Sequence, residues 1–451
     1  MNKNKIIFLI IGLVFLSLII FVVSNLNSAG KNKTNTKAPS DFSIWTVGDN
    51  SSNFSLFLEG FKSSFPEYKN ANITVESFPS YEDYSSALSR AFLNDKAPDI
   101  FVVNNNETSI FENQILGINP SAVDPDAFRK NYEAVFANDL ITSVASTDNS
   151  GTAKKTEFLK GIPLGYETMG VFYDMRVLRA KDLSTWASVN DAISYIKTSK
   201  GESLPIALGD GKSIKDSSDI MTEFFMQEGA KGLDDVKDNI AKQAFSRYFM
   251  YGDKSGDNAY LMKFDDSTNL NKTAMQLFSE GQVSMIIGYP RLVNDIDSTG
   301  FQKAFLRASP IPQMTNTNPL SLVNYNYFVV NKNTKKQDLS LSLMKYFASD
   351  KGEQDYHKAF PYYIPAMPNV ARETEDDDIK DGYSLKIKDF QNPNVELSSF
   401  NKKLKVVYDK GLSDILDNSL NYSFLFDSFT KNISCKYDKF INLTNFSRIC
   451  E

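Results

Sequence analysis

Acidic, amide and aromatic side chains recur directly after the apolar segments that the sequence predicts as strands. Aromatic rings can stack on the C–H faces of a sugar, and carboxylates or amides can hydrogen-bond its hydroxyl groups. Ligands of open α/β sheets bind beyond the carboxyl ends of the strands, so we expect these side chains to line one site. The candidates are Trp45, Asp49, Asn106, Glu107, Tyr166, Glu167, Tyr289, Arg291, Tyr325, Tyr327 and Tyr362.

Each candidate also has a purely structural interpretation. Trp45 alternates with Ile44 and could belong to the core, while Asp49 could only close a turn or cap a helix. Glu167 could be a hydrogen-bonding residue of a hinge, and Arg291 could form a surface salt bridge. The remaining candidates could be ordinary loop residues or could pack on a neighbouring element.

The sequence offers few residues for catalysis or metal binding. His357 is the single histidine, which excludes a His-rich zinc site, and its surroundings favour an ordinary histidine on a helix face or the surface. The stretch GDGKS at 209–213 lacks the first glycine of a phosphate-binding loop. In the acidic run 375–382, Lys380 stands where a calcium-binding loop needs Asp or Asn. We therefore expect no catalytic residue, no metal site and no cofactor.

Two cysteines, Cys435 and Cys450, lie close together near the C-terminal end of the sequence. Two cysteines alone cannot form a structural zinc site. In an oxidising compartment they could close a loop, which would stabilise the fold by about 3 kcal/mol in the loop-entropy model. The alternative is a pair of unbonded, partly buried thiols.

The elements that must position the candidates follow from hydrophobic periodicity. The predicted strands are 42–47, 73–78, 99–103, 204–208, 283–287 and 325–330, and the predicted helices are 54–65, 84–93, 186–196, 271–280 and 337–348. The strand–helix alternation of the first hundred residues predicts a mostly parallel α/β sheet with helices on both faces.

An apolar segment precedes all of these elements. Residues 6–23 are uncharged and form a run long enough to span a membrane, longer than the apolar region of a cleaved signal. We expect residues 1–24 to be an N-terminal transmembrane helix that anchors the protein; cleavage after Ser24 or Ala29 is the alternative. Residues 25–41 are rich in Asn, Ser, Lys and Thr and are predicted to be a flexible linker.

Length and composition restrict the class of protein. The chain has 451 residues, of which roughly 410 follow the N-terminal segment, too many for one ordinary domain and suited to two lobes. Its 42% hydrophobic and 23% charged residues are typical of a soluble globular protein. The net charge of −6 excludes the basic surface that nucleic-acid binding requires.

Seven segments occur in an order and spacing that point to a known family. They are IWTVGD (44–49), KAPDIFVVNN (96–105), GIPLGYETMGVFYD (161–174), LSTWASVNDAISYI (183–196), EGQVSMIIGYP (280–290), VNYNYFVVNKNTKKQDLSLSLMKYFAS (323–349) and PYYIPAMPNV (361–370). Together they resemble the extracellular solute-binding protein family 1, the maltose- and glycerol-phosphate-type receptors of ABC importers. The resemblance covers nearly the whole chain after residue 41.

The resemblance implies a periplasmic-binding-protein-like fold of type II, in which crossovers join two lobes that close like a hinge around the ligand. It assigns residues 42–164 and 310–357 to the N-terminal lobe, and 165–309 and 358–451, with a helical tail, to the C-terminal lobe. It also implies a monomer, tethered to the membrane outside the cytoplasm, that passes a solute to the permease subunits of an ABC transporter and catalyses nothing itself.

The family pattern and the aromatic content favour a sugar or oligosaccharide as the solute. Departures from the pattern leave its identity open, since Asp174 replaces an Asn, Arg291 replaces an aromatic residue and Tyr362 stands where Gly is common. Two other classes of protein remain as alternatives: a surface-anchored carbohydrate-active enzyme with paired carboxylates, and an adhesin that has kept the fold but lost transport.

Overall fold

The computed structural model describes residues 41–48, 51–147, 153–179, 182–200, 204–209, 211–250, 261–262, 273–315, 319–417, 422–441 and 450. Asp41–Lys69 and Ile73–Glu451 form one compact unit. The other unit comprises Met1–Ser40 and Asn70–Asn72, and only residues 70–72 of it are described. The elements that follow all belong to the larger unit.

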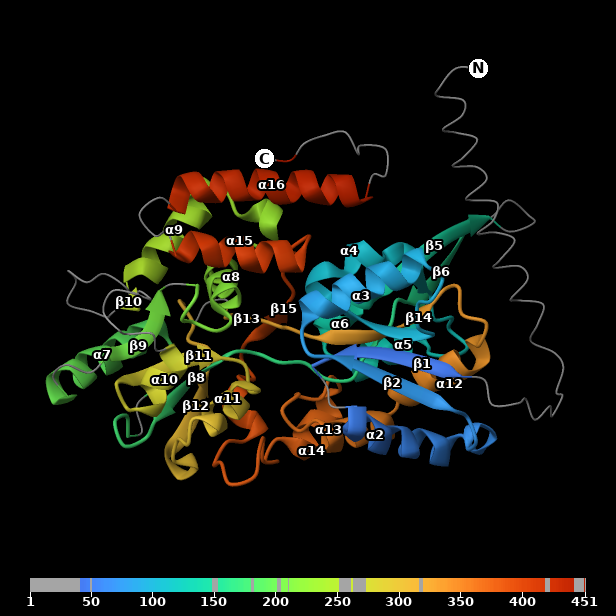
Figure 1. Cartoon of the computed structure of the whole chain (residues 1–451), viewed down its shortest axis with the longest axis horizontal. Coiled ribbons are helices and arrows are strands. Elements are labelled where there is room, and N and C mark those ends of the chain that lie inside the picture. The colour runs from blue at the N-terminus through green and yellow to red at the C-terminus, as the bar shows by residue number, and fades with distance from the viewer. Residues whose placement is uncertain are drawn as a thin grey trace, which may run out of the picture. The chain divides into compact units, whose positions relative to one another are not determined.

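A six-stranded sheet forms the core of what we call the first lobe (Figure 1). Its strands are β2 (Ile73–Phe78), β1 (Phe42–Val47), β3 (Ile100–Asn104), β14 (Asn326–Asn331) and β4 (Ile115–Leu116) in spatial order, with β7 (Ile162–Pro163) also paired to β14. β1 is parallel to β2 and β3, whereas β14 is antiparallel to β3. Every residue of β3 is buried, as expected for a strand covered on both faces.

Helices cover both faces of this sheet (Figure 1). The elements of the first lobe around the sheet are α2 (Ser51–Ser64), α3 (Tyr81–Leu93), α4 (Thr108–Phe111), α5 (Pro125–Asn131), α6 (Ala134–Leu140), the hairpin β5 (Ile141–Thr147) and β6 (Ala153–Leu159), α12 (Gln337–Phe347), α13 (Asp350–Ala359) and α14 (Pro368–Thr374). Phe54 and Phe57 of α2 pack against Tyr356 of α13, with ring centroids 6.3 and 5.6 Å apart. Buried aromatic rings therefore join segments that lie 300 residues apart in the sequence.

A five-stranded sheet forms the core of the second lobe. Its strands are β10 (Leu261–Met262), β9 (Leu204–Gly209), β11 (Val283–Gly288), β8 (Gly170–Asp174) and β12 (Leu306–Pro310) in spatial order. β9 and β11 are parallel, while β8 is antiparallel to both of its neighbours. The helices of this lobe are α7 (Trp186–Lys200), α8 (Ser217–Gln227), α9 (Asp238–Met250), α10 (Ala274–Ser279), α11 (Leu292–Ser298), α15 (Lys405–Asp417) and α16 (Tyr422–Ile441).

The chain crosses between the lobes at residues 164–169, 311–325 and 375–379. The first crossover is hydrogen-bonded through Glu167 to Asn324 of the second crossover, and β13 (Leu320–Leu322) of the second pairs in parallel with β15 (Glu396–Ser398). The third crossover follows α14, because α14 bonds to α13 through Asn369 and Asp350.

The C-terminal helices α15 and α16 pack side by side on the second lobe (Figure 1). Cys435 of α16 and Cys450 form a disulfide, and their Cα atoms are 5.7 Å apart. In the part of the chain that the structure describes, no helix has the length and apolar character needed to cross a membrane. The expected anchor at 1–24 lies outside the described residues, as does the expected linker apart from residue 41.

Candidate functional site

A cavity of about 1020 Å³ lies between the two lobes, at the carboxyl ends of strands from both sheets. Its volume is at the upper end of the range for small-molecule sites, and its position is the one that ligands take in open α/β sheets. The lining residues at or after strand ends are Val47 at the end of β1 and Gly48 after it, Pro79 and Ser80 after β2, Asn104 at the end of β3, Gly211 after β9 and Arg291 after β11.

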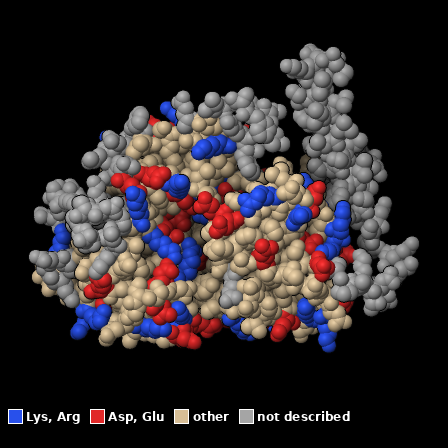
Figure 2. All heavy atoms as spheres, viewed as in Figure 1, with Lys and Arg blue, Asp and Glu red and all other residues tan. Residues whose placement is uncertain are grey.

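Charged residues gather around this hollow, and Figure 2 shows acidic and basic side chains intermixed there. The charged lining residues are the acids Glu167, Asp216, Asp219, Asp295 and Asp409 and the bases Lys212, Lys215, Arg291 and Lys405. All except Glu167 come from the second lobe or from the helices packed on it. The lining thus contains one more acidic than basic side chain.

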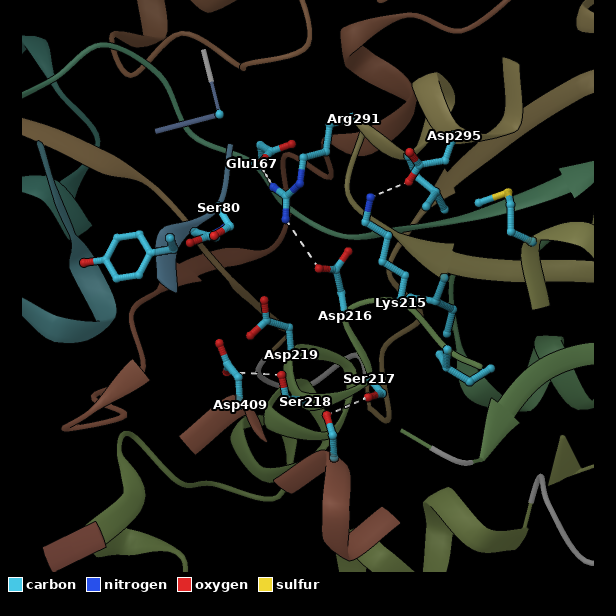
Figure 3. Close-up of a pocket in the computed structure, with 18 of the residues that line it drawn as sticks. Ser80, Glu167, Lys215, Asp216, Ser217, Ser218, Asp219, Arg291, Asp295 and Asp409 are labelled. Atoms are coloured by element: carbon cyan, nitrogen blue, oxygen red, sulfur yellow. Dashed lines mark hydrogen bonds and ion pairs between the residues drawn. The ribbon is translucent and has the colours of Figure 1, made fainter. Parts of the chain in front are cut away.

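Arg291, which directly precedes α11, lies at the centre of the charged wall (Figure 3). Its guanidinium lies over the ring of Tyr289, 4.5 Å from the ring centroid. It donates to Oε2 of Glu167 and, through Nη2, to Oδ1 of Asp216 at 3.4 Å. The Tyr289 hydroxyl in turn donates to Asp219 at 2.9 Å, so the arginine is fixed from below and on two sides.

Each of the two carboxylates beside Arg291 has one oxygen without a hydrogen-bond partner among the described residues. Glu167 is only 1% exposed, and its Oε1 is buried without a hydrogen-bond partner among the described residues. Oδ2 of Asp216 is likewise buried without a hydrogen-bond partner among the described residues. Burial raises the pKa of Glu167 to about 7, although Arg291 favours its charged form, and burial also raises the pKa of Asp216. The cavity therefore contains two buried acceptors that a ligand can satisfy.

Asp216 reaches this position through an unusual backbone conformation. It precedes α8 with φ at 56°, in the left-handed region that Asp adopts more readily than most residues. An aspartate at this position normally accepts a hydrogen bond from the first turn of the helix, but this side chain makes no capping bond. Its carboxylate faces Arg291 instead.

A buried ion-pair network lies below the arginine and connects α8 to α15. Lys402, fully buried, donates to Asp219 of α8 and to Asp409 of α15, the latter at 2.6 Å. Lys405 also contacts Asp409, at 2.5 Å. Burial opposes ionisation of Asp219, but the ammonium groups of Lys402 and Lys405 hold its pKa below the ordinary value. This part of the wall is therefore fully charged and internally paired.

The wall of the first lobe is built from rings and amides. Its lining residues of these types are Tyr81, Asn104, Asn324, Tyr325, Asn326, Tyr362 and Tyr363. Asn104 Nδ2 donates to the side-chain oxygens of Asn324 and Asn326 at 3.0 and 3.1 Å. Gly165 allows the loop that carries Tyr363 to lie close to the first crossover, because a Cβ at residue 165 would lie only 2.8 Å from the Cβ of Tyr363.

Four residues singled out from the sequence line the cavity: Glu167, Arg291, Tyr325 and Tyr362. They come from the first crossover, the turn after β11, the end of the second crossover and the loop before α14. The fold thus brings together positions that the sequence separates by up to 195 residues, as the strand-end argument predicts. Asp49 lies outside the described residues.

The other candidates lie outside the lining, and packing explains the positions of three aromatic ones. Trp45 packs on Phe78 with ring centroids 5.1 Å apart, and Tyr166 packs on Phe136 at 5.6 Å. Tyr327 is fully buried. The candidates placed outside the lining are Trp45, Asn106, Glu107, Tyr166, Tyr289 and Tyr327.

Two of these residues support the site from behind. Tyr289 lies under the Arg291 guanidinium, and Glu107 accepts the backbone N–H of Lys405 at 3.1 Å, which joins the first lobe to α15. Burial raises the pKa of Glu107 to about 7. Asn106, beside it in the 3₁₀ turn after β3, is 1% exposed.

His357 lies in helix α13, in agreement with the helix-face position that the sequence favoured, and its side chain is buried. Its Nδ1 lies 3.1 Å from the carbonyl oxygen of Tyr363, and its Nε2 lies 3.3 Å from Asp377. Burial lowers the pKa of this imidazole. Among the described residues, no group of three or more His, Cys, Asp or Glu side chains could hold a metal ion.

Sequence reasoning missed the segment 211–219 and the residues of α15. The segment follows β9, and the strand-end argument that selected the other candidates would also have selected it. It was set aside because GDGKS fails as a phosphate-binding loop. Lys405 and Asp409 carried no such signal, because only the fold brings α15 to the first turn of α8.

Residues 62–386 match the family model described as bacterial extracellular solute-binding protein. No curated protein sequence matches the chain.

Several solved structures share the fold at low sequence identity. The GacH receptor of Streptomyces glaucescens, studied unliganded and with acarbose, is 16% identical with a TM-score of 0.61 over 90% of this chain and 99% of that chain. An ABC substrate-binding protein of Listeria monocytogenes in complex with cycloalternan is 12% identical, with a TM-score of 0.63 over 89% and 99%. The maltotriose-binding protein of Thermus thermophilus is 14% identical, with a TM-score of 0.59 over 88% and 99%. These similarities show a two-lobed, periplasmic-binding-protein-like α/β fold.

Proposed function

The chain belongs to the bacterial extracellular solute-binding proteins, and we propose that it captures a saccharide outside the cytoplasm and delivers it to an ABC importer. The observation that carries this proposal is the cavity between the lobes, with tyrosines and asparagines on one wall and carboxylates on the other. Rings can cover the C–H faces of sugars, and amides and carboxylates can bind their hydroxyl groups. The three similar structures are of proteins solved with acarbose or cycloalternan or named for maltotriose.

Capture requires that the lobes close on the solute. The three crossovers are the places where backbone rotation can bring the walls together. The first two are hydrogen-bonded to each other through Glu167 and Asn324, so they would move as one hinge. Closure would bury the solute between the ring wall and the charged wall and exclude water from both.

The remaining parts of the proposal concern location and partners. Residues 1–24 would tether the protein to the membrane, and residues 25–41 would be a flexible linker between this anchor and the folded lobes. The protein would be a monomer that passes the solute to the permease subunits of an importer. Binding without turnover fits the internal pairing of the carboxylates, because Glu167 and Asp216 are both held by Arg291. Release of a chromophore from any chromogenic glycoside would favour the enzyme alternative instead.

A thermal-shift panel tests the proposal. The protein would be heated with neutral saccharides, amino saccharides, amino acids and inorganic phosphate at millimolar concentration. A solute present at 100 times its Kd stabilises the folded state by about 2.7 kcal/mol, so at least one saccharide should raise the Tm by several degrees. If no saccharide raises the Tm while another class of solute does, the saccharide proposal fails.

A further inference from the structure

We propose that the solute is a saccharide bearing an unsubstituted amino group, and that Glu167 and Asp216 bind its ammonium on either side of Arg291. This inference rests on the proposed function and specifies its solute class. The site is shown in Figure 3, where Glu167, Arg291 and Asp216 converge.

The first argument comes from the polar atoms that have no partner. Oε1 of Glu167 and Oδ2 of Asp216 are buried and unpartnered among the described residues. Both oxygens are hydrogen-bond acceptors. Glu167 lines the cavity although its exposed fraction is only 1%. Buried acceptors without donors are costly, so the ligand that completes this site supplies donors.

The second argument comes from the cations of the lining. Arg291 is bound by Glu167 and Asp216, Lys215 by Asp295, and Lys405 by Asp409. Lys212, an exposed residue, has an interaction of its own as well. An anionic saccharide that binds Arg291, Lys215 or Lys405 would have to displace a carboxylate from that cation, which makes a phosphorylated or uronic solute a poor fit.

The third argument is the charge of the cluster itself. Two carboxyl groups face one guanidinium, so the cluster has one more acidic than basic group in a site that closure would bury further. A buried net charge is strongly unfavourable unless it is paired. An ammonium group supplies the missing positive charge together with three N–H donors for these oxygens, whereas a hydroxyl supplies one donor and no charge.

The arrangement is rigid enough to recognise such a group. The Tyr289 ring supports Arg291 from below, and Tyr289 is held by Asp219, which is held by buried Lys402. The free oxygens are therefore positioned before the solute arrives, which reduces the entropic cost of binding. The positive end of the α8 dipole is already complemented by Asp216 and Asp219 in and before its first turn, so it does not call for an anion.

Isothermal titration with matched trisaccharides tests the inference. The ligands are the trimer of glucosamine, its fully N-acetylated form and maltotriose, at a pH where the amines are protonated. The glucosamine trimer should bind at least 10-fold more tightly than the other two. Glu167→Gln and Asp216→Asn should each weaken its binding at least 10-fold, and each should weaken binding of the glucosamine trimer more than binding of a neutral trisaccharide.

Asp297→Asn is the matched control, because this carboxylate on α11 pairs with Lys303 and Lys380 outside the cavity lining. It should leave every affinity within 2-fold. Equal or tighter binding of a neutral trisaccharide would overturn the amino-group inference and leave the saccharide function standing. Tight binding of the glucosamine trimer that neither variant weakens would overturn the assigned residues. If no saccharide binds at all, the proposed function fails together with the inference.

Discussion

The two walls of the cavity hold their side chains in different ways. On the first-lobe wall, Tyr362 and Tyr363 are partly exposed rings that contact each other at 5.1 Å. On the second-lobe wall, Lys402 is fully buried and holds two carboxylates from different helices. The rings can be altered without disturbing the fold, whereas the same ion pairs that shape the charged wall also join α8 to α15.

This difference separates affinity from stability. A residue of the ring wall adds contact area to a bound solute and little to the folded state without one. A buried ion pair contributes to the stability of the folded state more than to affinity, since removal of one partner leaves an uncompensated charge in the interior. Substitutions on the two walls should therefore produce distinct combinations of effects, and three experiments test this expectation.

Lys402→Met should have the largest effect. It removes the cation between Asp219 and Asp409 and should lower the free energy of unfolding by about 3–5 kcal/mol, measured by urea denaturation. Lys215→Met is the matched control, because the Lys215–Asp295 pair is 48% and 44% exposed, and it should cost less than about 1 kcal/mol. Equal losses in the two variants would remove the distinction between a structural ion-pair network and ordinary surface pairs.

The pH dependence of stability tests whether buried carboxyl groups lie in both lobes. Burial raises the pKa of Glu223 in α8 to about 7 and that of Glu353 in α13 to about 8, from 4.5. The folded protein then binds more protons than the unfolded chain between these values and 4.5. Stability should therefore fall as the pH rises from 5 to 8, by about 2–3 kcal/mol for each group.

Glu223→Gln and Glu353→Gln should each remove part of this slope. Glutamine keeps an oxygen that can accept the backbone N–H of Leu322 at position 223 and of Met367 at position 353. Its side chain does not titrate between pH 5 and 8. Each variant should match the parent near pH 5 and exceed its stability near pH 8, measured by urea denaturation across the series. A parent protein that becomes more stable from pH 5 to 8, with no change in slope in either variant, would contradict the assignment.

Tyr362→Ala should have the smallest effect on free energy and should act on affinity alone. Loss of one stacking ring should weaken saccharide binding about 10-fold, close to 1.4 kcal/mol, and leave the Tm of the free protein nearly unchanged. Titration calorimetry and thermal unfolding give the two readouts. Tyr195→Ala, at an exposed ring on α7, should change neither. A large fall in Tm without loss of affinity would show that the ring serves the fold instead.

Much of the first lobe follows from local pattern. The alternation of strands and helices after residue 41 predicted a largely parallel sheet, and β1, β2 and β3 form it. The antiparallel β14 could not be derived in this way, because its neighbour β3 lies more than 200 residues earlier and only the family resemblance implied the return of the chain.

The site was predicted less completely than the fold. The strand-end argument reaches Glu167 and Arg291 because each lies directly beside an apolar segment with strong strand character. It fails for Trp45, whose ring faces Phe78 in place of the cavity, since a sequence does not reveal which face of a strand meets the ligand. It also cannot reveal Lys405 and Asp409, which contribute only because two distant helices cross.

The three crossovers also bear on how the molecule would respond to damage. A protease that cuts one crossover leaves the lobes joined by the other two. The pairing of β13, in the second crossover, with β15 gives a further non-covalent connection. Such a nicked molecule should survive as a single particle in native electrophoresis and separate into fragments only in detergent. Fragmentation on a denaturing gel would therefore be a poor guide to loss of the working receptor.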